Sequence, residues 1–231
     1  MVIKPLYLLA DSQLLFVKSG GDSLAERIRA DLDTSNPKAA YVGASNGDQP
    51  EFYSLFQAAM EVMGISDCRA VPSQPSREDI LFIEAANLIL LAGGDVERGW
   101  RTFEQNGLKE LVPRRRFDGA VLIGVSAGAV QLGLGCLSNA AQPKQIDMFR
   151  FAPFYVGAHD EGNDWFDLRA LVNLAQSDAR GIGLSVGGGA VYYADGTLEP
   201  LRKPLIEILK EDSKITENLM APLDPSRLPQ D

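Results

Sequence analysis

The residues best suited to do chemistry form the stretch Gly124-Val125-Ser126-Ala127-Gly128. The stretch ends an apolar run and precedes a helical pattern, so the serine lies at an expected strand-to-helix turn. Such a turn is sharp, strains the serine backbone and directs its hydroxyl out of the sheet, while the flanking glycines let strand and helix approach closely. The pattern predicts Ser126 as a nucleophile. The alternative is a tight turn whose serine only caps the helix.

The chain has one histidine, His159, which follows Ser126 in the sequence. A serine hydroxyl needs a neighbour that accepts its proton near neutral pH, and imidazole has a suitable ordinary pKa. A lone histidine is more often a surface or structural residue, but together with this serine motif His159 is the expected general base. Lysine could replace it, yet no Ser-x-x-Lys pattern occurs at Ser126.

Two adjacent glycines, Gly93 and Gly94, end an earlier apolar run. Glycines allow backbone N–H groups to turn outward toward a ligand, which an oxyanion hole requires. A plain loop explains the same pair equally well, so spacing alone leaves both readings open.

The elements that must position these residues alternate between strands and helices. Apolar runs predict strands at Ala39–Ala44, Cys68–Val71, Asn87–Ala92 and Gly119–Val125. Helical patterns predict helices at Glu51–Met63, Ser76–Glu84 and Val96–Glu104. Continuously apolar strands separated by helices indicate an α/β fold with a mostly parallel sheet, flavodoxin-like and covered by helices on both faces. Ligands then bind beyond the carboxyl ends of the strands.

The pattern changes after Gly181, where short strands alternate with turn residues. We expect strands at Ile182–Val186, Ala190–Ala194, Leu198–Pro200 and Leu205–Leu209. They predict an antiparallel extension of the same domain, so residues 1–231 form one α/β unit with a tail that is loosely held from about residue 212.

Composition excludes several classes of protein. The net charge of −9 repels phosphate backbones, so nucleic-acid binding is not expected. Cys68 and Cys136 are far apart in sequence and, with one histidine, supply no recognisable metal site. The N-terminal apolar run is too short for a secretory signal and no stretch is long enough to span a membrane, so a cytoplasmic protein is the default expectation.

These segments resemble the serine peptidase family S51, which includes aspartyl dipeptidases (peptidase E) and cyanophycinases. The strongest match is GVSAGAV around Ser126, followed by LILLAGGDVERGW, which is similar to the cyanophycinase-type version of the loop. Pro153–Val156 leading to His159, and Gly181–Leu184 followed by Asp195-Gly196, resemble two further family segments. The resemblance runs from the Ala39 strand to about Gly196.

Several properties follow from the resemblance. It implies a class I glutamine amidotransferase-like fold, Ser126 as nucleophile and His159 as base. It also implies the amides of Gly94 and Ala127 as oxyanion donors. The expected reaction is hydrolysis of a peptide bond next to an aspartyl residue in a small peptide, with no metal and no cofactor.

The sequence departs from the family pattern at two places. The acidic third member of the triad usually lies between the serine and the histidine, and the only carboxylate there is Asp147. Asp147 is therefore the candidate, with a backbone carbonyl or no orienting group as alternatives. Ser185-Val186 stands where many relatives carry an acidic pair, so the family's substrate does not transfer directly.

An aspartyl substrate needs a cation for its carboxylate, preferably an arginine. Arg98 is the first candidate because it follows the glycine loop, with Arg150 and Arg169 as alternatives. Gly93 and Asp95 of the same loop are expected at the substrate. Asn46 could bind the substrate's amine, or could only make a local turn.

Three functions remain open on these observations. The first is a peptidase acting on small aspartyl peptides, and the second is an amidase or esterase using the same groups on another acyl substrate. The third is a catalytically silent binding protein of the same fold. Related folds often form homodimers, but the sequence does not specify an oligomeric state.

Overall fold

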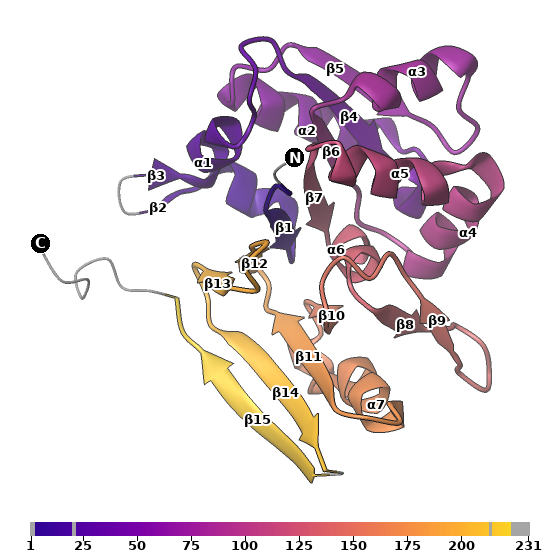
Figure 1. Ribbon diagram of the computed structural model, residues 1–231, viewed down its shortest axis with the longest axis vertical. Coiled ribbons are helices and arrows are strands. Elements are labelled where there is room, and N and C mark those ends of the chain that lie inside the picture. The colour runs from indigo at the N-terminus through magenta and orange to yellow at the C-terminus, as the bar shows by residue number, and fades with distance from the viewer. Residues whose placement is uncertain (1–2, 20–21, 213, 223–231) are drawn as a thin grey trace, which may run out of the picture.

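The computed structural model describes residues 3–19, 22–212 and 214–222. Its central layer is a seven-stranded sheet (Figure 1). The strand order is β13-β12-β1-β7-β6-β4-β5. The strands are β1 (Leu6–Leu9), β4 (Lys38–Val42), β5 (Asp67–Val71), β6 (Leu88–Leu91), β7 (Val121–Val125), β12 (Gly189–Tyr192) and β13 (Leu198–Leu201). All neighbouring pairs from β1 to β5 are parallel, whereas β12 and β13 add antiparallel partners beside β1. The predicted α/β fold with a mostly parallel sheet and an antiparallel extension is confirmed.

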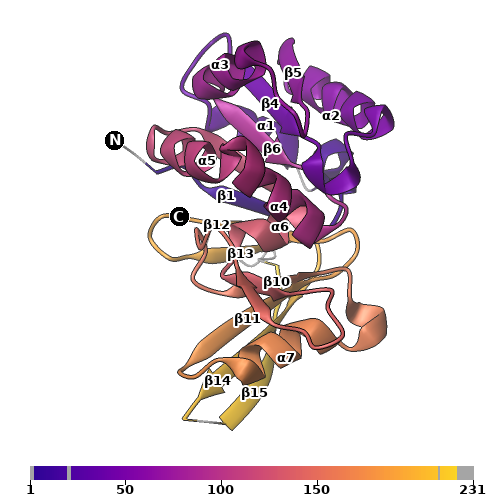
Figure 2. The same cartoon turned by 90° about the vertical axis from the view of Figure 1, so that its right-hand side faces the viewer.

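Helices cover both faces of this sheet because its strands are apolar on both sides. In β1, Leu6 and Leu8 face one core while Tyr7 and Leu9 face the other. The first core is closed by α3 (Arg77–Ala85), α4 (Val96–Asn106), α5 (Leu108–Phe117) and α6 (Ala127–Leu132), and the second by α1 (Leu24–Ala30), α2 (Pro50–Val62) and η1 (Ser12–Phe16) (Figure 2). Each fully buried leucine or isoleucine contributes roughly 1.5–3 kcal/mol to this arrangement.

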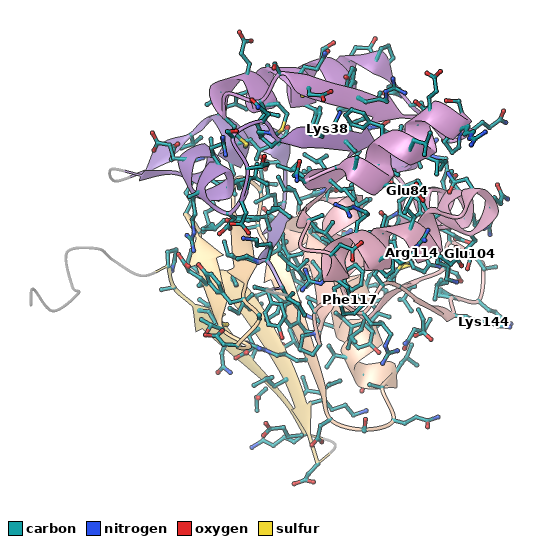
Figure 3. The ribbon with its side chains drawn as sticks, turned by 45° about the horizontal axis from the view of Figure 1, so that its top comes forward. Lys38, Glu84, Glu104, Arg114, Phe117 and Lys144 are labelled. Atoms are coloured by element: carbon teal, nitrogen blue, oxygen red, sulfur yellow. The ribbon has the colours of Figure 1, made fainter. Side chains whose placement is uncertain are left out.

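The predicted helices form close to their expected bounds. Helix α3 begins with a capping box, in which Ser76 and Asp79 each accept a hydrogen bond from the other's backbone amide. Helix α5 was not predicted, because Pro113 interrupts its pattern. On the outer surface of this layer Glu84, Glu104 and Arg114 extend into solvent (Figure 3).

The C-terminal region builds a second sheet, which was not foreseen. Its order is β10-β11-β14-β15, with β10 (Tyr155–Ala158), β11 (Ala179–Leu184), β14 (Leu205–Glu211) and β15 (Lys214–Met220). In Figure 1 the β14-β15 hairpin extends away from the main sheet. The expectation of a loose tail from about residue 212 is wrong for Lys214–Met220, which pairs with β14 along its whole length. Its polar residues reflect an exposed edge strand.

The remaining elements are short strands, 3-10 turns and one further helix. They are β2 (Lys18–Ser19), β3 (Asp22–Ser23), η2 (Ala44–Asn46), β8 (Gly135–Leu137), β9 (Gln145–Asp147), η3 (Glu161–Asn163) and α7 (Phe166–Leu174). Helix α7 covers the second sheet through a core that includes Trp165, Leu168 and Ile208. Within the described ranges, no helix has the length and apolar character needed to cross a lipid bilayer.

Candidate active site

Ser126 lies at a strained turn between β7 and α6. Its backbone has φ 51° and ψ −110°, a region that residues other than glycine rarely adopt. The Ser126 amide donates to the Leu9 carbonyl of β1 at 2.8 Å, which fixes the turn against the neighbouring strand. The sheet therefore holds Ser126 in this strained conformation, which places the serine hydroxyl at the carboxyl edge of the parallel strands.

The two glycines of the motif are needed for close packing. A Cβ at Gly128 would lie 2.0 Å from the Leu91 carbonyl oxygen, and one at Gly124 would lie 2.6 Å from the Ala129 amide nitrogen. Neither gap admits a side chain. The sequence pattern thus has a steric cause, because α6 starts directly against the ends of β6 and β7.

His159 approaches Ser126 from the second sheet. It follows β10, has φ 44°, and its amide donates to the Leu184 carbonyl of β11 at 2.8 Å. The ring Nε2 lies 2.6 Å from the Ser126 Oγ, which is hydrogen-bonding distance. A neutral ring that carries its proton on Nδ1 can accept the serine proton at Nε2. The serine hydroxyl and the imidazole are therefore in contact and suitably arranged for proton transfer.

The structure does not bring Asp147 to this pair. Its carboxylate accepts hydrogen bonds from Gln145 Nε2 at 3.1 Å and Arg150 Nη1 at 3.4 Å, at the exposed end of β9. Over the described residues, no side chain hydrogen-bonds the His159 Nδ1. Of the carboxylates adjoining the histidine, Glu161 accepts the Val186 amide instead. The ring is held through its main chain rather than by an acid.

The glycine loop after β6 faces Ser126 across the sheet edge. A Cβ on Gly93 would lie 3.2 Å from the Ser126 Cβ and 3.8 Å from its Oγ. Gly94 has φ +129°, and a Cβ there would lie 2.2 Å from the Ser45 carbonyl oxygen, so only glycine fits. In the described structure neither the Gly94 nor the Ala127 amide donates to another protein group. Both N–H groups are thus available to a ligand.

Arg98 and Asp95 stabilise this loop, and neither residue lines the pocket beside Ser126 and His159. Arg98 donates to the Ser45 carbonyl from Nη2 at 2.6 Å and from Nε at 3.2 Å. The Asp95 amide donates to the same oxygen at 2.8 Å, and the Asp95 carboxylate caps α4 by accepting the Arg98 amide. These contacts give the arginine a structural partner, which its position after the loop could not reveal. Of the alternatives, Arg169 pairs with Asp164 and Glu217.

Asn46 is buried and bonded within the protein. Its Nδ2 donates to the Tyr41 hydroxyl at 2.7 Å and its Oδ1 accepts the Gln49 amide at 3.2 Å. Sequence reasoning missed Gln131, a fully buried residue of α6 that donates to Ser45 Oγ and to the Val96 carbonyl, both at 3.1 Å. A glutamine inside an apolar helix pattern was the available signal, since such a group needs buried partners.

A pocket of about 270 Å³ opens beside Ser126 and His159. Gly93 and Gly94 form part of its wall, while most of the rest is apolar and comes from η1, α2 and the ends of β6 and β7. Phe52 and Leu55 of α2 reach this pocket although 45% and 46% of their surface is exposed. The sequence predicted the helix that carries these residues, Glu51–Met63, but it did not predict the pocket.

The two cysteines lie outside this pocket and are poor nucleophiles. Burial, aided by the negative charges of Glu97 and Asp95, raises the pKa of the Cys136 thiol to about 12. Burial and Asp67 also raise the pKa of Cys68. Because the thiolate is the reactive form, Cys136 carries at pH 8 about a thousandth of the thiolate of an ordinary cysteine.

We expect iodoacetamide at pH 8 to alkylate Cys136 of the folded protein at least about 100-fold more slowly than after unfolding in urea. Mass spectrometry of a time course, with the urea-treated sample as control, measures both rates. Equal rates in the two samples would contradict the burial of this thiol.

Comparisons with known proteins match the chain to one family model and to solved structures. The model of peptidase family S51 matches residues 7–198. The crystal structure of a peptidase from an acI-B1 Actinobacterium is similar with a TM-score of 0.68 at 15% identity, covering 94% of this chain and 98% of that one. A putative peptidase E protein from Listeria monocytogenes EGD-e gives 0.58 at 14% identity, covering 94% and 99%. These two likenesses establish a shared fold. No curated protein matches the sequence.

Proposed function

The chain belongs to peptidase family S51 and is a serine peptidase, and from this premise we propose that it cleaves small peptides through an acyl-enzyme on Ser126. In this proposal His159 is the general base and the amides of Gly94 and Ala127 form the oxyanion hole. The observation that carries it is the 2.6 Å contact between Ser126 Oγ and His159 Nε2 at a strained strand-to-helix turn. Proximity of this kind supplies much of the rate of an enzyme reaction.

Acylation would use these groups in order. The Ser126 Oγ attacks the carbonyl carbon while its proton passes to His159 Nε2. The carbonyl oxygen becomes negative and accepts hydrogen bonds from the two free amides, each contributing about 3 kcal/mol in comparable sites. The C–N bond then breaks as His159 returns the proton to the leaving nitrogen.

Deacylation would repeat the sequence with water. His159 takes a proton from a water molecule, whose oxygen attacks the ester carbon. The Ser126 Oγ leaves and recovers its proton from the ring, which restores the starting state. All of these steps use the chain's own groups and water.

The orientation of His159 differs from a triad with an acid. The hydrogen bond from its amide to Leu184 and its left-handed backbone set the ring's position. In serine proteases the acid fixes the tautomer and stabilises the imidazolium, and replacing it has a large cost. We therefore expect a catalytic pair, slower than a full triad, rather than a silent binding protein.

The aspartyl preference implied by the resemblance lacks a cation at this pocket. Arg98, the first candidate, binds the Ser45 carbonyl, and neither Arg150 nor Arg169 lines the pocket. The proposal therefore covers the peptide bond and not an aspartyl side chain. We propose neither a cytoplasmic location nor a homodimer.

Labelling with a fluorophosphonate tests the proposed pair. We expect the wild type to be labelled at Ser126, labelling to be absent in Ser126→Ala, and the labelling rate to fall by at least about 100-fold in His159→Ala. Ser12→Ala is the matched control, because Ser12 lines the same pocket but has no histidine beside its hydroxyl. A wild type that resists labelling would contradict the proposed acyl-enzyme on Ser126.

A further inference from the structure

The pocket beside the serine has the chemistry of an apolar subsite. Six of its side chains are leucine, phenylalanine or tyrosine and come from η1, β4, α2 and β6, namely Leu15, Tyr41, Phe52, Leu55, Phe56 and Leu90. Tyr41, Tyr53 and Phe56 form a contiguous aromatic cluster behind it, with ring centroids 5.4–5.9 Å apart. An apolar wall of this kind favours the binding of an apolar ligand group and does not stabilise a charged one.

Two polar side chains at the wall, those of Tyr41 and Asn46, are bonded to other protein groups. The Tyr41 hydroxyl accepts a hydrogen bond from Asn46, whose own oxygen accepts the Gln49 amide. These bonds direct the polar ends of both side chains toward the protein.

The charges at the pocket oppose an acidic ligand. In the described ranges, the residues that line it include no lysine and no arginine, and His159 is their one basic side chain. The one carboxyl group among these lining residues is that of Asp11. Its Oδ1 accepts the Gln13 amide at 2.9 Å and its Oδ2 accepts the Gly187 amide at 2.6 Å, which keeps it in place. A substrate carboxylate entering here would lose its water shell without finding a cation, next to a fixed negative charge.

We propose that this pocket binds a large apolar side chain, aromatic or branched aliphatic, on the acyl side of the scissile bond. The inference rests on the proposed function and names its substrate class. Gly93 and Gly94 line the pocket, so a group attached to the carbonyl carbon enters it when the carbonyl oxygen faces the glycine loop. Leu90 of β6 and Ala92, which follows the strand, line the same pocket.

Matched substrates test the preference. Coumarin amides of phenylalanine, leucine, alanine and aspartate differ only in the acyl side chain. We expect kcat/KM for the phenylalanyl or leucyl amide to exceed that for alanyl by about 10- to 100-fold, the effect of burying one large apolar side chain. The aspartyl amide should be the poorest of the four. Equal or faster cleavage of the aspartyl amide would overturn the inference.

A variant on α2 tests the location of the subsite. Leu55→Arg introduces a cation at the pocket wall, at a residue exposed enough to tolerate the change. The phenylalanyl-to-aspartyl ratio of kcat/KM should fall at least about 10-fold. Val62→Arg is the matched control, because Val62 is an exposed residue two turns further along the same helix and does not line the pocket. The control should keep the wild-type ratio within about 2-fold, and an unchanged ratio in Leu55→Arg would refute the assignment.

Fluorophosphonate labelling separates the two levels of the proposal. Absence of labelling at Ser126 in the wild type would refute the proposed function itself. Labelling without an apolar preference would refute only the subsite. If no amide is cleaved, fluorophosphonates carrying a benzyl or a carboxymethyl group are compared by their labelling rates, and a faster carboxymethyl reagent would contradict the inference.

Discussion

Ser126→Ala is expected to lower kcat/KM by at least about 10⁴-fold, the size of effect that follows removal of a serine nucleophile. Its Oγ is the atom that would carry the acyl group, and the 2.6 Å contact with His159 Nε2 has no function without it. The residual rate comes from substrate binding and from the free amides of Gly94 and Ala127. Initial rates on the best coumarin amide, with enzyme concentration fixed by absorbance, measure the loss.

The double variant Ser126→Ala/His159→Ala makes this prediction specific to a catalytic pair. Residues that act as a unit are strongly non-additive, so the double variant should be no slower than Ser126→Ala within about 3-fold. Two independent effects would multiply instead, and a double variant another 100-fold slower would contradict the pairing. Circular dichroism of all three proteins checks that the fold is intact.

The proposed catalytic pair joins two sheets, whereas the sequence predicted a single sheet with an antiparallel extension. Ser126 follows β7 of the main sheet, whereas His159 follows β10 of the second. Both residues were predictable because their chemistry is local: a nucleophile motif and a single imidazole. The contact between the two side chains depends on how β10 and β11 pack against the main sheet. This tertiary packing leaves no periodic pattern in the sequence.

Strand pairing explains most of what was missed in the fold. The Leu6–Leu9 run was not predicted as a strand, yet it forms the strand between β7 and β12. Four residues cannot reveal that position, because a short apolar run fits several partners. The second sheet was missed because partner choice between short strands is set by tertiary contacts.

Glycines in β11 show the physical basis of that second sheet. A Cβ on Gly183 would lie 2.3 Å from Ile206 Cγ2 and 2.7 Å from Trp165 Cε3, and one on Gly181 would lie 2.8 Å from Val172 Cγ2. Helix α7 and β14 therefore reach the strand because it lacks side chains at these positions. The Gly-Ile-Gly pattern was visible in the sequence, but the helix and strand that need it were not.

The residues around the site were harder to predict than the pair itself. Asp147 was the one carboxylate between serine and histidine, but chain order does not make it a neighbour of the ring. Arg98 was assigned to substrate from its position after the glycine loop, whereas a carbonyl oxygen of η2 takes its hydrogen bonds. In both cases the sequence gives the residue type and the structure gives its partner.

Gly94→Ala should lower kcat by about 10²- to 10³-fold, because it displaces the loop amide that faces the developing oxyanion. The added methyl would lie 2.2 Å from the Ser45 carbonyl oxygen at a φ of +129°, so the loop must move. The movement also breaks the packing against Ser45, where Asp95 and Arg98 donate, and the melting temperature should fall with the rate. Steady-state kinetics and thermal unfolding by circular dichroism measure the two effects.

Gly196→Ala separates the catalytic effect from backbone strain alone. Gly196 also has a positive φ, +90°, but a methyl there meets nothing within 4 Å and lies in a distant turn. That control should lose about 1–2 kcal/mol of stability and keep its kcat within about 2-fold. Gly93→Ala supplies a folded test if Gly94→Ala proves too unstable, because its backbone is unstrained and its methyl would lie 3.2 Å from the Ser126 Cβ. Wild-type kcat in both loop variants would contradict the proposed role of the Gly94 amide, because displacing this loop would then leave the reaction unchanged.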